Sequence, residues 1–405
     1  MSDINLSKSD NNLPKPRLSV VIVSYNCAAF LGLTLHALLW KKQDGLEVLV
    51  VDNASSDDTA ALLRSRFPQV ELVLNAENVG FGRACNQGME RARGEYLLML
   101  NPDTYVPEDL CERVVDFMDQ HPDGGAMGVR MLDGRGRFLP ESKRGLPTVF
   151  RSFCRFSGLS RLFPSSALLA GYYAAQVGEH ETAPVEVLSG AFMVLRRTAV
   201  DQVGGFDEDF FMYGEDIDLS WRIHRAGFRN YYHAGISIVH FKGESTLRNR
   251  RYVEMFYGAM ELFYQKHTKR KGFWSGSWLV VPAIRMLARM ALWRLAFQRR
   301  PGREETPLPA SAVLLSEEQT PALRFAGLER VYPCCHNGEQ QDFGSGACLL
   351  DTSTCRPSKI LDFVNRKALI CKQFLWLLPN RKILLQPLSA SNRSVMHEEA
   401  AEQPV

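Results

Sequence analysis

The residues best suited to chemistry follow a buried apolar run. Residues Tyr96 to Leu100 are apolar throughout, and Asn101-Pro102-Asp103 comes directly after them. Such a run predicts a central strand of a parallel sheet, and Pro102 forces the chain to leave the sheet. We therefore expect Asn101 and Asp103 at the carboxyl edge of the strand, where open α/β sheets bind ligands. A carboxylate there is a candidate anchor for a divalent cation and the phosphates that it carries.

A second acidic group lies in the stretch Glu215-Asp216-Ile217-Asp218. From about Asp216 the apolar spacing is helical and Gly227 ends the pattern, so Asp216 is expected at a helix N-terminus, facing back along the preceding loop. Favourable interaction with the helix dipole explains acids at such a position without any functional role.

The elements that must position these residues alternate between strand and helix. Each predicted strand is followed by polar residues at what should be one edge of one sheet, which favours a site, although turns alone also favour Asn and Asp. This order predicts an α/β fold with a parallel central sheet flanked by helices. The predicted strands are Leu18–Val23, Leu46–Val51, Val70–Leu74 and Tyr96–Leu100, and the predicted helices between them include Ala28–Trp40 and Arg83–Arg93.

The following region is less regular. Gly125 to Leu139 predicts short strands and turns, Val185 to Leu195 a strand interrupted at Ser189-Gly190-Ala191, and Tyr231 to His240 two short strands. Glu141 to Gln176 mixes aromatic and basic residues. It fits either a lid near an anionic or lipid-bearing substrate or a solvated basic loop.

Composition limits the class and compartment of the protein. The 405 residues are 45% hydrophobic and 23% charged, with a net charge of +3, as in an ordinary soluble protein. Nine cysteines without paired metal-type spacing indicate reduced thiols. We find no signal-peptide core near the N-terminus, and arginines interrupt the longest apolar stretch, Trp278 to Phe297. We expect a cytoplasmic protein.

The C-terminal part differs in character from the rest. Tyr252 to His267 predicts a helix, and Phe273 to Phe297 combines tryptophans with Arg285, Arg289 and Arg294, roughly on one helical face. That pattern suits a helix at a membrane surface, which would place the protein peripherally at the inner face of the plasma membrane. It equally suits a helix packed on the main domain. Residues 301–320 predict a linker, and the stretch after it predicts neither fold nor role.

The expected organisation is a disordered N-terminus over residues 1–16, a main domain over 17–250, amphipathic helices over 251–300, and a linker with an irregular tail over 301–405.

Taken together, the motifs resemble family 2 glycosyltransferases, most closely the bacterial rhamnosyltransferase-like branch. The likeness covers about Leu18 to Ser245 and excludes the tail. The ordered motifs are Ser19 to Asn26, Val50 to Asp57, Asn78 to Gly82 with Asn86, Asn101 to Asp103, Gly190-Ala191, Gly205 to Asp207, Glu215 to Leu219, and His240.

The resemblance implies a GT-A fold and inverting transfer of a sugar from a nucleoside-diphosphate sugar. By this likeness Asp52 accepts a hydrogen bond from the base, and the backbone at Ser24 and Tyr25 holds the nucleoside. Asn78, Gly80 and Gly190 belong to the implied donor-binding set. Asn101 replaces the first acid of the family's metal motif, which leaves one charge fewer for the metal and makes a ribose contact the better expectation.

The resemblance also assigns the metal and the base. Asp103 matches the last acid of the metal motif, and His240 matches a downstream histidine that would complete the shell of Mg²⁺ or Mn²⁺; His240 would also suit a packed strand end. Asp216 matches the general base that takes the acceptor's proton, with Glu215 supporting it. Arg83 suits a diphosphate contact or a solvated helix surface.

The implied function is transfer of a sugar, with dTDP-rhamnose as the suggested donor, to a glycan or lipid-linked glycan in cell-surface polysaccharide synthesis. We expect no nucleic-acid partner. One alternative is a non-catalytic membrane-surface protein on the same scaffold. Another is a nucleotidyltransferase, which would want a glycine-rich loop after the first strand, where Ser24 to Ala29 has no glycine. A dinucleotide-binding oxidoreductase is rejected, because Gly80 and Gly82 follow the third strand instead of the first.

Overall fold

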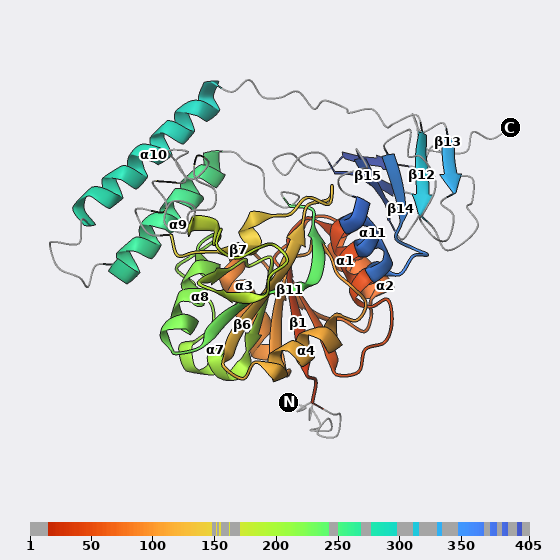
Figure 1. Ribbon diagram of the computed structural model, residues 1–405, viewed down its shortest axis with the longest axis horizontal. Helices are drawn as coiled ribbons and strands as arrows, with labels where there is room; N and C mark the ends of the chain where they lie inside the picture. Colours follow the sequence, from red (N-terminus) through yellow and green to blue (C-terminus); the bar gives the residue numbers. More distant parts are fainter. Residues whose placement is uncertain are drawn as a thin grey trace, which may run out of the picture.

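A computed structural model shows two large sheets and one two-stranded sheet, with helices packed around them (Figure 1). The residues that it describes are 15–147, 151, 154, 162, 171–242, 250–268, 277–297, 311–315, 330–333, 347–367, 373–378, 383–387 and 395–398. The predicted N-terminal lead-in lies outside them up to residue 14, as does most of the segment between 148 and 170.

The main sheet has nine strands in the order β3-β2-β1-β4-β10-β6-β11-β5, with β8 paired to β11. The first four strands in this order are mutually parallel, whereas β10 runs antiparallel to β4. This is the α/β architecture of the prediction. The strands are β1 Leu18–Ser24, β2 Leu46–Asp52, β3 Glu71–Leu74, β4 Tyr96–Leu100, β5 Thr104–Tyr105, β6 Gly124–Leu132, β8 Ala183–Val185, β10 Phe192–Arg196 and β11 Arg229–His240.

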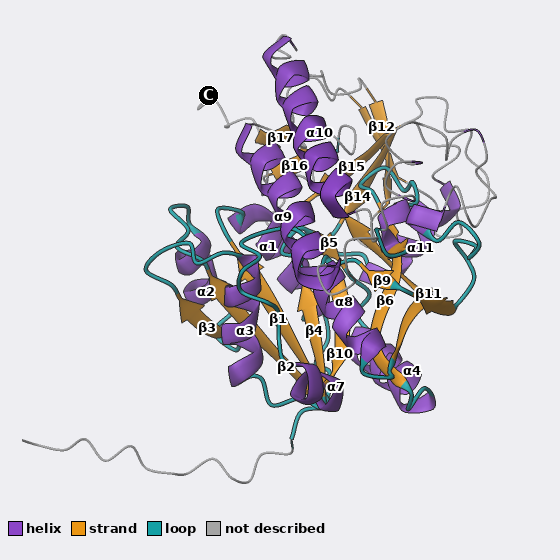
Figure 2. Cartoon of the chain, turned by 90° about the vertical axis from the view of Figure 1, so that its left-hand side faces the viewer, coloured by secondary structure: helices purple, strands orange, loops and turns teal. Residues whose placement is uncertain are grey.

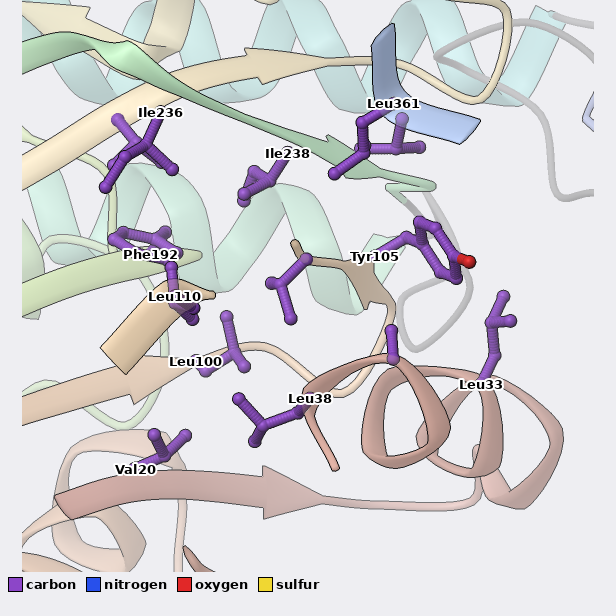
Figure 3. Packing of buried hydrophobic residues seen from close by; sticks show 14 of the residues in the cluster. Val20, Leu33, Leu38, Leu100, Tyr105, Leu110, Phe192, Ile236, Ile238 and Leu361 are labelled. Carbon is purple, nitrogen blue, oxygen red and sulfur yellow. The ribbon is translucent and has the colours of Figure 1, made fainter. Parts of the chain in front are cut away.

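Helices cover both faces of this sheet (Figure 2). Strand β4 is buried along its whole length, and its side chains alternate between two cores: Leu98 and Leu100 belong to one, Leu97 and Met99 to the other. Figure 3 shows Leu100 with Val20 and Phe192 in the first core. The helices are α1 Ala28–Leu38, α2 Thr59–Arg66, α3 Phe81–Arg91, α4 Leu110–Gln120, α7 Arg197–Val203 and α8 Glu215–Arg225.

Two predictions for the second half of this domain were wrong. Residues 124–132 form one buried strand, β6, instead of short strands and turns. Residues 229–240 form one strand, β11, whose register against β6 shifts between His233 and Ser237. The irregularity in the sequence therefore marks a bulge in a continuous strand.

The basic segment after β6 begins with a short 3₁₀ turn at Pro140–Ser142 and strand β7 Lys143–Arg144, which pairs with β9 Val187–Leu188. A second 3₁₀ turn spans Gly171–Tyr173. Arg144 thereby approaches the strand that precedes Gly190.

Two long helices follow, α9 Arg250–Thr268 and α10 Ser277–Phe297, and they lie against one another. The arginines of α10 do not share one face, because at 3.6 residues per turn Arg285 and Arg294 point in opposite directions. Arg285 pairs with Glu261 of α9 at 2.6 Å. Among the described helices, none has the length and hydropathy needed to cross a bilayer.

The region from residue 301 was predicted as a linker and irregular tail. It instead contains a six-stranded sheet, called the second sheet below, in the order β13-β12-β14-β15-β16-β17. Long polar stretches between short strands hid this sheet from pattern reasoning. Its buried residues join the core of the main domain, and Leu361 packs there (Figure 3). The elements are β12 Ser311–Leu315, β13 Arg330–Pro333, β14 Ala347–Asp351, α11 Pro357–Lys367, β15 Gln373–Leu377, β16 Ile383–Gln386 and β17 Val395–Glu398.

Candidate active site

The carboxyl ends of β1, β2 and β4 form the predicted polar edge. Ser24 and Asp52 end neighbouring parallel strands in register, and Asn101 follows β4. Asp52 is buried and accepts a hydrogen bond from the amide of Ser55 at 3.3 Å. The Ser24 side chain is also buried, whereas Tyr25 is exposed. The backbone at Ser24–Tyr25 and the Asp52 carboxylate thus belong to one edge, as predicted.

Asn53, which the sequence analysis did not select as a site residue, organises the donor-side loop. Its amide nitrogen donates to Asn78 Oδ1 at 3.0 Å and to the Gly80 carbonyl at 3.2 Å. Its amide oxygen accepts from the Val79 amide and from Asn75 Nδ2, each at 3.1 Å. Both polar ends of the side chain are therefore fully used. The position of Asn53, directly after Asp52 at a strand end, was the signal available.

Gly80 is required by both conformation and space. Its φ is +90°, and a Cβ there would lie 2.8 Å from the Phe211 carbonyl oxygen, which accepts the Phe81 amide. The loop before α8 therefore reaches the donor-side loop. Arg83 is exposed and lies 3.8 Å from Glu208, which matches the solvated alternative.

Asp103 and His240 meet at the predicted cation position. Their Oδ1 and Nε2 atoms are 3.3 Å apart, and the Asp103 side chain is 2% exposed. Asn101 Nδ2 lies 3.4 Å from the same imidazole nitrogen. Asp103 Oδ1 and His240 Nδ1 are buried without hydrogen-bond partners among the described residues. Since His240 Nε2 is the nitrogen that faces Asp103 Oδ1, these two atoms are the ones that could share a cation. A buried carboxylate oxygen without a hydrogen-bond partner is uncommon and fits a ligand position.

The donor set of this pair is small. Across the described residues, no group of three or more His, Cys, Asp or Glu side chains could hold a metal. One carboxylate oxygen and one imidazole nitrogen suit Mg²⁺ or Mn²⁺ only if the nucleotide phosphates and water supply the remaining ligands.

Asp216 lies in the first turn of α8, as predicted, and three donors orient its carboxylate. The Ile217 amide donates to Oδ1 at 2.8 Å, and the other two donate to Oδ2. Its Oδ2 accepts the Gly190 amide at 3.0 Å and a hydrogen bond from Arg144. The side chains of Asp216 and Arg144 are 13% and 16% exposed. The sequence analysis did not identify Arg144 as the partner of Asp216. Gly190 lies close to Asp216, since a Cβ built there would be 3.3 Å from Asp216 Cβ, a tight contact.

Glu215 and Asp216 occupy different environments. Burial, followed by the nearby charge of Asp216, raises the pKa of Glu215 to about 8. Glu215 is therefore protonated at neutral pH, and Asp216 is the member of the pair with access to solvent.

Asp218 has a structural role. It accepts hydrogen bonds from Arg222 Nε at 2.7 Å and faces His267 Nε2 of α9 at 2.6 Å. Arg222 lies one turn further along α8, whereas the His267 contact fastens α8 to α9. Asp218 therefore serves packing.

A short path of contacts joins Asp216 to Asp103. The Gly190 amide binds Asp216, and the next residue, Ala191, accepts the Asn101 amide through its carbonyl at 3.0 Å. Asn101 then contacts His240, which contacts Asp103. The two carboxylates, far apart in sequence, therefore lie at one edge of the sheet.

Comparison with known proteins defines the family. Residues 19–204 match the model of glycosyl transferase family 2. The chain is 31% identical over 243 residues to an N-acetylglucosaminyl-diphospho-decaprenol L-rhamnosyltransferase of Mycobacterium tuberculosis. The aligned region covers 57% of this chain and 78% of that relative. This chain belongs to glycosyl transferase family 2. It is an enzyme, a glycosyltransferase, and its mixed α/β sheet agrees with the GT-A fold that the resemblance implies.

Other similar proteins share less with this glycosyltransferase. It is 27% identical over 236 residues to a poly-beta-1,6-N-acetyl-D-glucosamine synthase of Staphylococcus aureus, across 57% of the chain and 50% of that relative. Among solved structures, the mannosyltransferase PcManGT from Pyrobaculum calidifontis gives a TM-score of 0.45 at 20% identity, over 71% of this chain and 76% of that one. The second sheet lies beyond the family model.

Proposed function

We propose that this glycosyltransferase inverts the anomeric centre of a nucleoside-diphosphate sugar while transferring the sugar to a hydroxyl of a glycan or lipid-linked glycan. The carrying observation is the contact path from Asp216 through Gly190, Ala191, Asn101 and His240 to Asp103. It supports a base and a diphosphate anchor on either side of one bound sugar.

The donor half of the proposed site consists of residues at or just after the carboxyl ends of the strands. Asp52 accepts a hydrogen bond from the base, and Asn78 and Gly80, fixed by Asn53, line the nucleoside. The backbone at Ser24 and Tyr25 contacts the same nucleoside. Asn101, beside His240, is placed for the ribose.

The acceptor half centres on Asp216. Breaking the anomeric bond leaves positive charge on the sugar and negative charge on the departing diphosphate. The acceptor hydroxyl attacks from the opposite face and must lose its proton as its oxygen bonds to the anomeric carbon. Glu215 keeps its own proton because burial raises its pKa, which leaves Asp216 to receive one. Arg144 and the Gly190 amide hold Oδ2 and so orient the carboxylate.

Asp103 and His240 would hold Mg²⁺ or Mn²⁺. When bound, the cation supplies Lewis-acid stabilisation of the charge that develops on the departing diphosphate. The support for this assignment is that Asp103 Oδ1 is buried without a hydrogen-bond partner among the described residues and faces His240 Nε2 at 3.3 Å.

For the donor sugar we propose rhamnose carried on dTDP, in cell-surface polysaccharide synthesis. Support comes from the relative that is named an L-rhamnosyltransferase, at 31% identity. That relative's name contains a diphospho-decaprenol acceptor, which supports a lipid-linked glycan as the acceptor here.

The proposal includes attachment to an anionic membrane surface through α10. Met286, Met290, Trp293 and Phe297 are exposed and recur at helical spacing. At 3.6 residues per turn, Arg289 lies on one side of this stripe and Arg294 on the other, and both are exposed. An apolar stripe between cations matches the interface of a bilayer with acidic headgroups.

The test is a panel of nucleotide sugars, screened by thermal shift with Mn²⁺ and followed by hydrolysis and transfer assays. Asp216→Asn should abolish turnover while nucleotide binding remains. Asp201→Asn, at an exposed position of α7, is the control and should behave like wild type. Full activity of Asp216→Asn would overturn the base assignment, and turnover of no nucleotide sugar by wild type would favour the non-catalytic alternative.

A further inference from the structure

Trp376 of the second sheet is fully buried against the main domain. Its ring meets Tyr105 edge-on at a centroid distance of 5.3 Å and Phe241 at 5.1 Å. Its indole nitrogen donates to the Gly134 carbonyl at 3.1 Å. One side chain of the second sheet thus touches three segments of the glycosyltransferase domain.

Two of these segments carry the cation ligands. Phe241 directly follows His240, and Tyr105 lies two residues after Asp103. Strand β5 pairs with the end of β11, with His240 opposite Thr104, and the Phe241 amide donates to the Asp103 carbonyl at 3.0 Å. Trp376 therefore packs on side chains carried by the two segments whose backbone sets the separation of the Asp103 and His240 side chains.

The strand pair needs this support. Strand β5 has two residues and pairs with β11 at the end of the sheet order, and so small a ladder is marginal without packing. Helix α11, which lies between β14 and β15 in the chain, is held to the main domain near both of its ends: Glu108 accepts two hydrogen bonds from Ser358, and Arg130 donates to Asn365 at 2.9 Å.

We propose that Trp376 is a positioning residue through which the second sheet sets the geometry of the Asp103–His240 pair. The inference rests on the proposed role of that pair in holding a divalent cation. It gives the C-terminal sheet, which lies beyond the family model, a direct part in donor binding. Edge-to-face packing of aromatic rings is directional enough to fix such a position.

The experiment measures Mn²⁺ binding to the full chain by electron paramagnetic resonance, in parallel series with dTDP and with UDP. Trp376→Leu should weaken Mn²⁺ binding by about tenfold, the scale seen for residues behind metal ligands. Trp376→Phe keeps an aromatic ring and should largely restore the affinity. Thermal unfolding reports separately on whether each variant is folded.

Phe374→Ala is the matched control. Phe374 is fully buried on the same face of β15, but its ring packs on Phe363 of α11 at 6.4 Å. It should lower thermal stability and leave Mn²⁺ affinity unchanged. Equal Mn²⁺ affinity in wild type and folded Trp376→Leu would overturn the inference while the proposed function stands. If wild type binds the nucleotide but no Mn²⁺, the cation assignment and this inference fall together.

Discussion

Arg144 and Gly190 both donate to one oxygen of Asp216, Oδ2, although Arg144 precedes Asp216 by 72 residues. Arg144 also donates to the Leu188 carbonyl at 3.0 Å, so its guanidinium bridges the strand before Gly190 and the proposed base. The two contacts tie the carboxylate to the same loop that binds Asn101 through Ala191.

Replacing Arg144 with alanine should therefore impair the chemical step. Without Arg144, only the Gly190 amide holds Oδ2 and only the Ile217 amide holds Oδ1, so the carboxylate is less firmly aligned with the acceptor hydroxyl. A misplacement of this kind costs about 10²-fold in rate. We expect kcat for nucleotide-sugar hydrolysis to fall by about that factor, while calorimetric nucleotide affinity stays unchanged. An unaltered kcat, or a loss confined to nucleotide affinity, would show that the ion pair does not serve the base.

Replacing Asp103 with alanine should remove the effect of Mn²⁺ on nucleotide binding. Asp103 Oδ1 is buried beside His240 and has no hydrogen-bond partner among the described residues, so the substitution removes the proposed ligand without removing a hydrogen bond to that oxygen. Titration of dTDP and UDP with and without Mn²⁺ measures the difference. Manganese-dependent affinity equal to that of wild type would contradict the metal assignment.

The sequence predicted the site's edge better than its partners. Apolar runs and the polar residues after them located Asp52, Asn101 and Asp103, because strand burial and strand ends leave local patterns. The contact of Arg144 with Asp216 leaves no local pattern in the sequence, because it depends on the pairing of β7 with β9, more than 40 residues further along the chain. The role of Trp376 could not be predicted for the same reason, because its partners Tyr105 and Phe241 lie far from it in the sequence, in the main domain.

The raised pKa of Glu215 predicts a pH dependence of stability. Between its ordinary pKa of 4.5 and its folded pKa of about 8, the unfolded chain loses the Glu215 proton while the folded chain keeps it. The folded state then binds more protons, so rising pH lowers the free energy of unfolding through this window. Glu215→Gln has no proton to lose and should gain stability relative to wild type as the pH rises.

Urea unfolding at about pH 5 and about pH 8 measures this difference. Glu90→Gln, at an exposed position of α3, is the control and should show no trend of this kind. A stability difference between Glu215→Gln and wild type that stays constant over the two conditions would mean that Glu215 ionises as freely in the folded chain as in the unfolded one.

Charge and apolar changes on α10 should act differently on membrane binding. Trp293→Ser with Phe297→Ser removes exposed apolar area and should reduce sedimentation with vesicles at any salt concentration. Arg289→Gln with Arg294→Gln should reduce binding only to vesicles that contain phosphatidylglycerol, and the loss should shrink at high salt because charges at a surface are screened. Leu74→Ser, an exposed apolar position on β3, controls for hydrophobicity in general. Sedimentation of both double variants at the wild-type level would exclude α10 as the attachment surface.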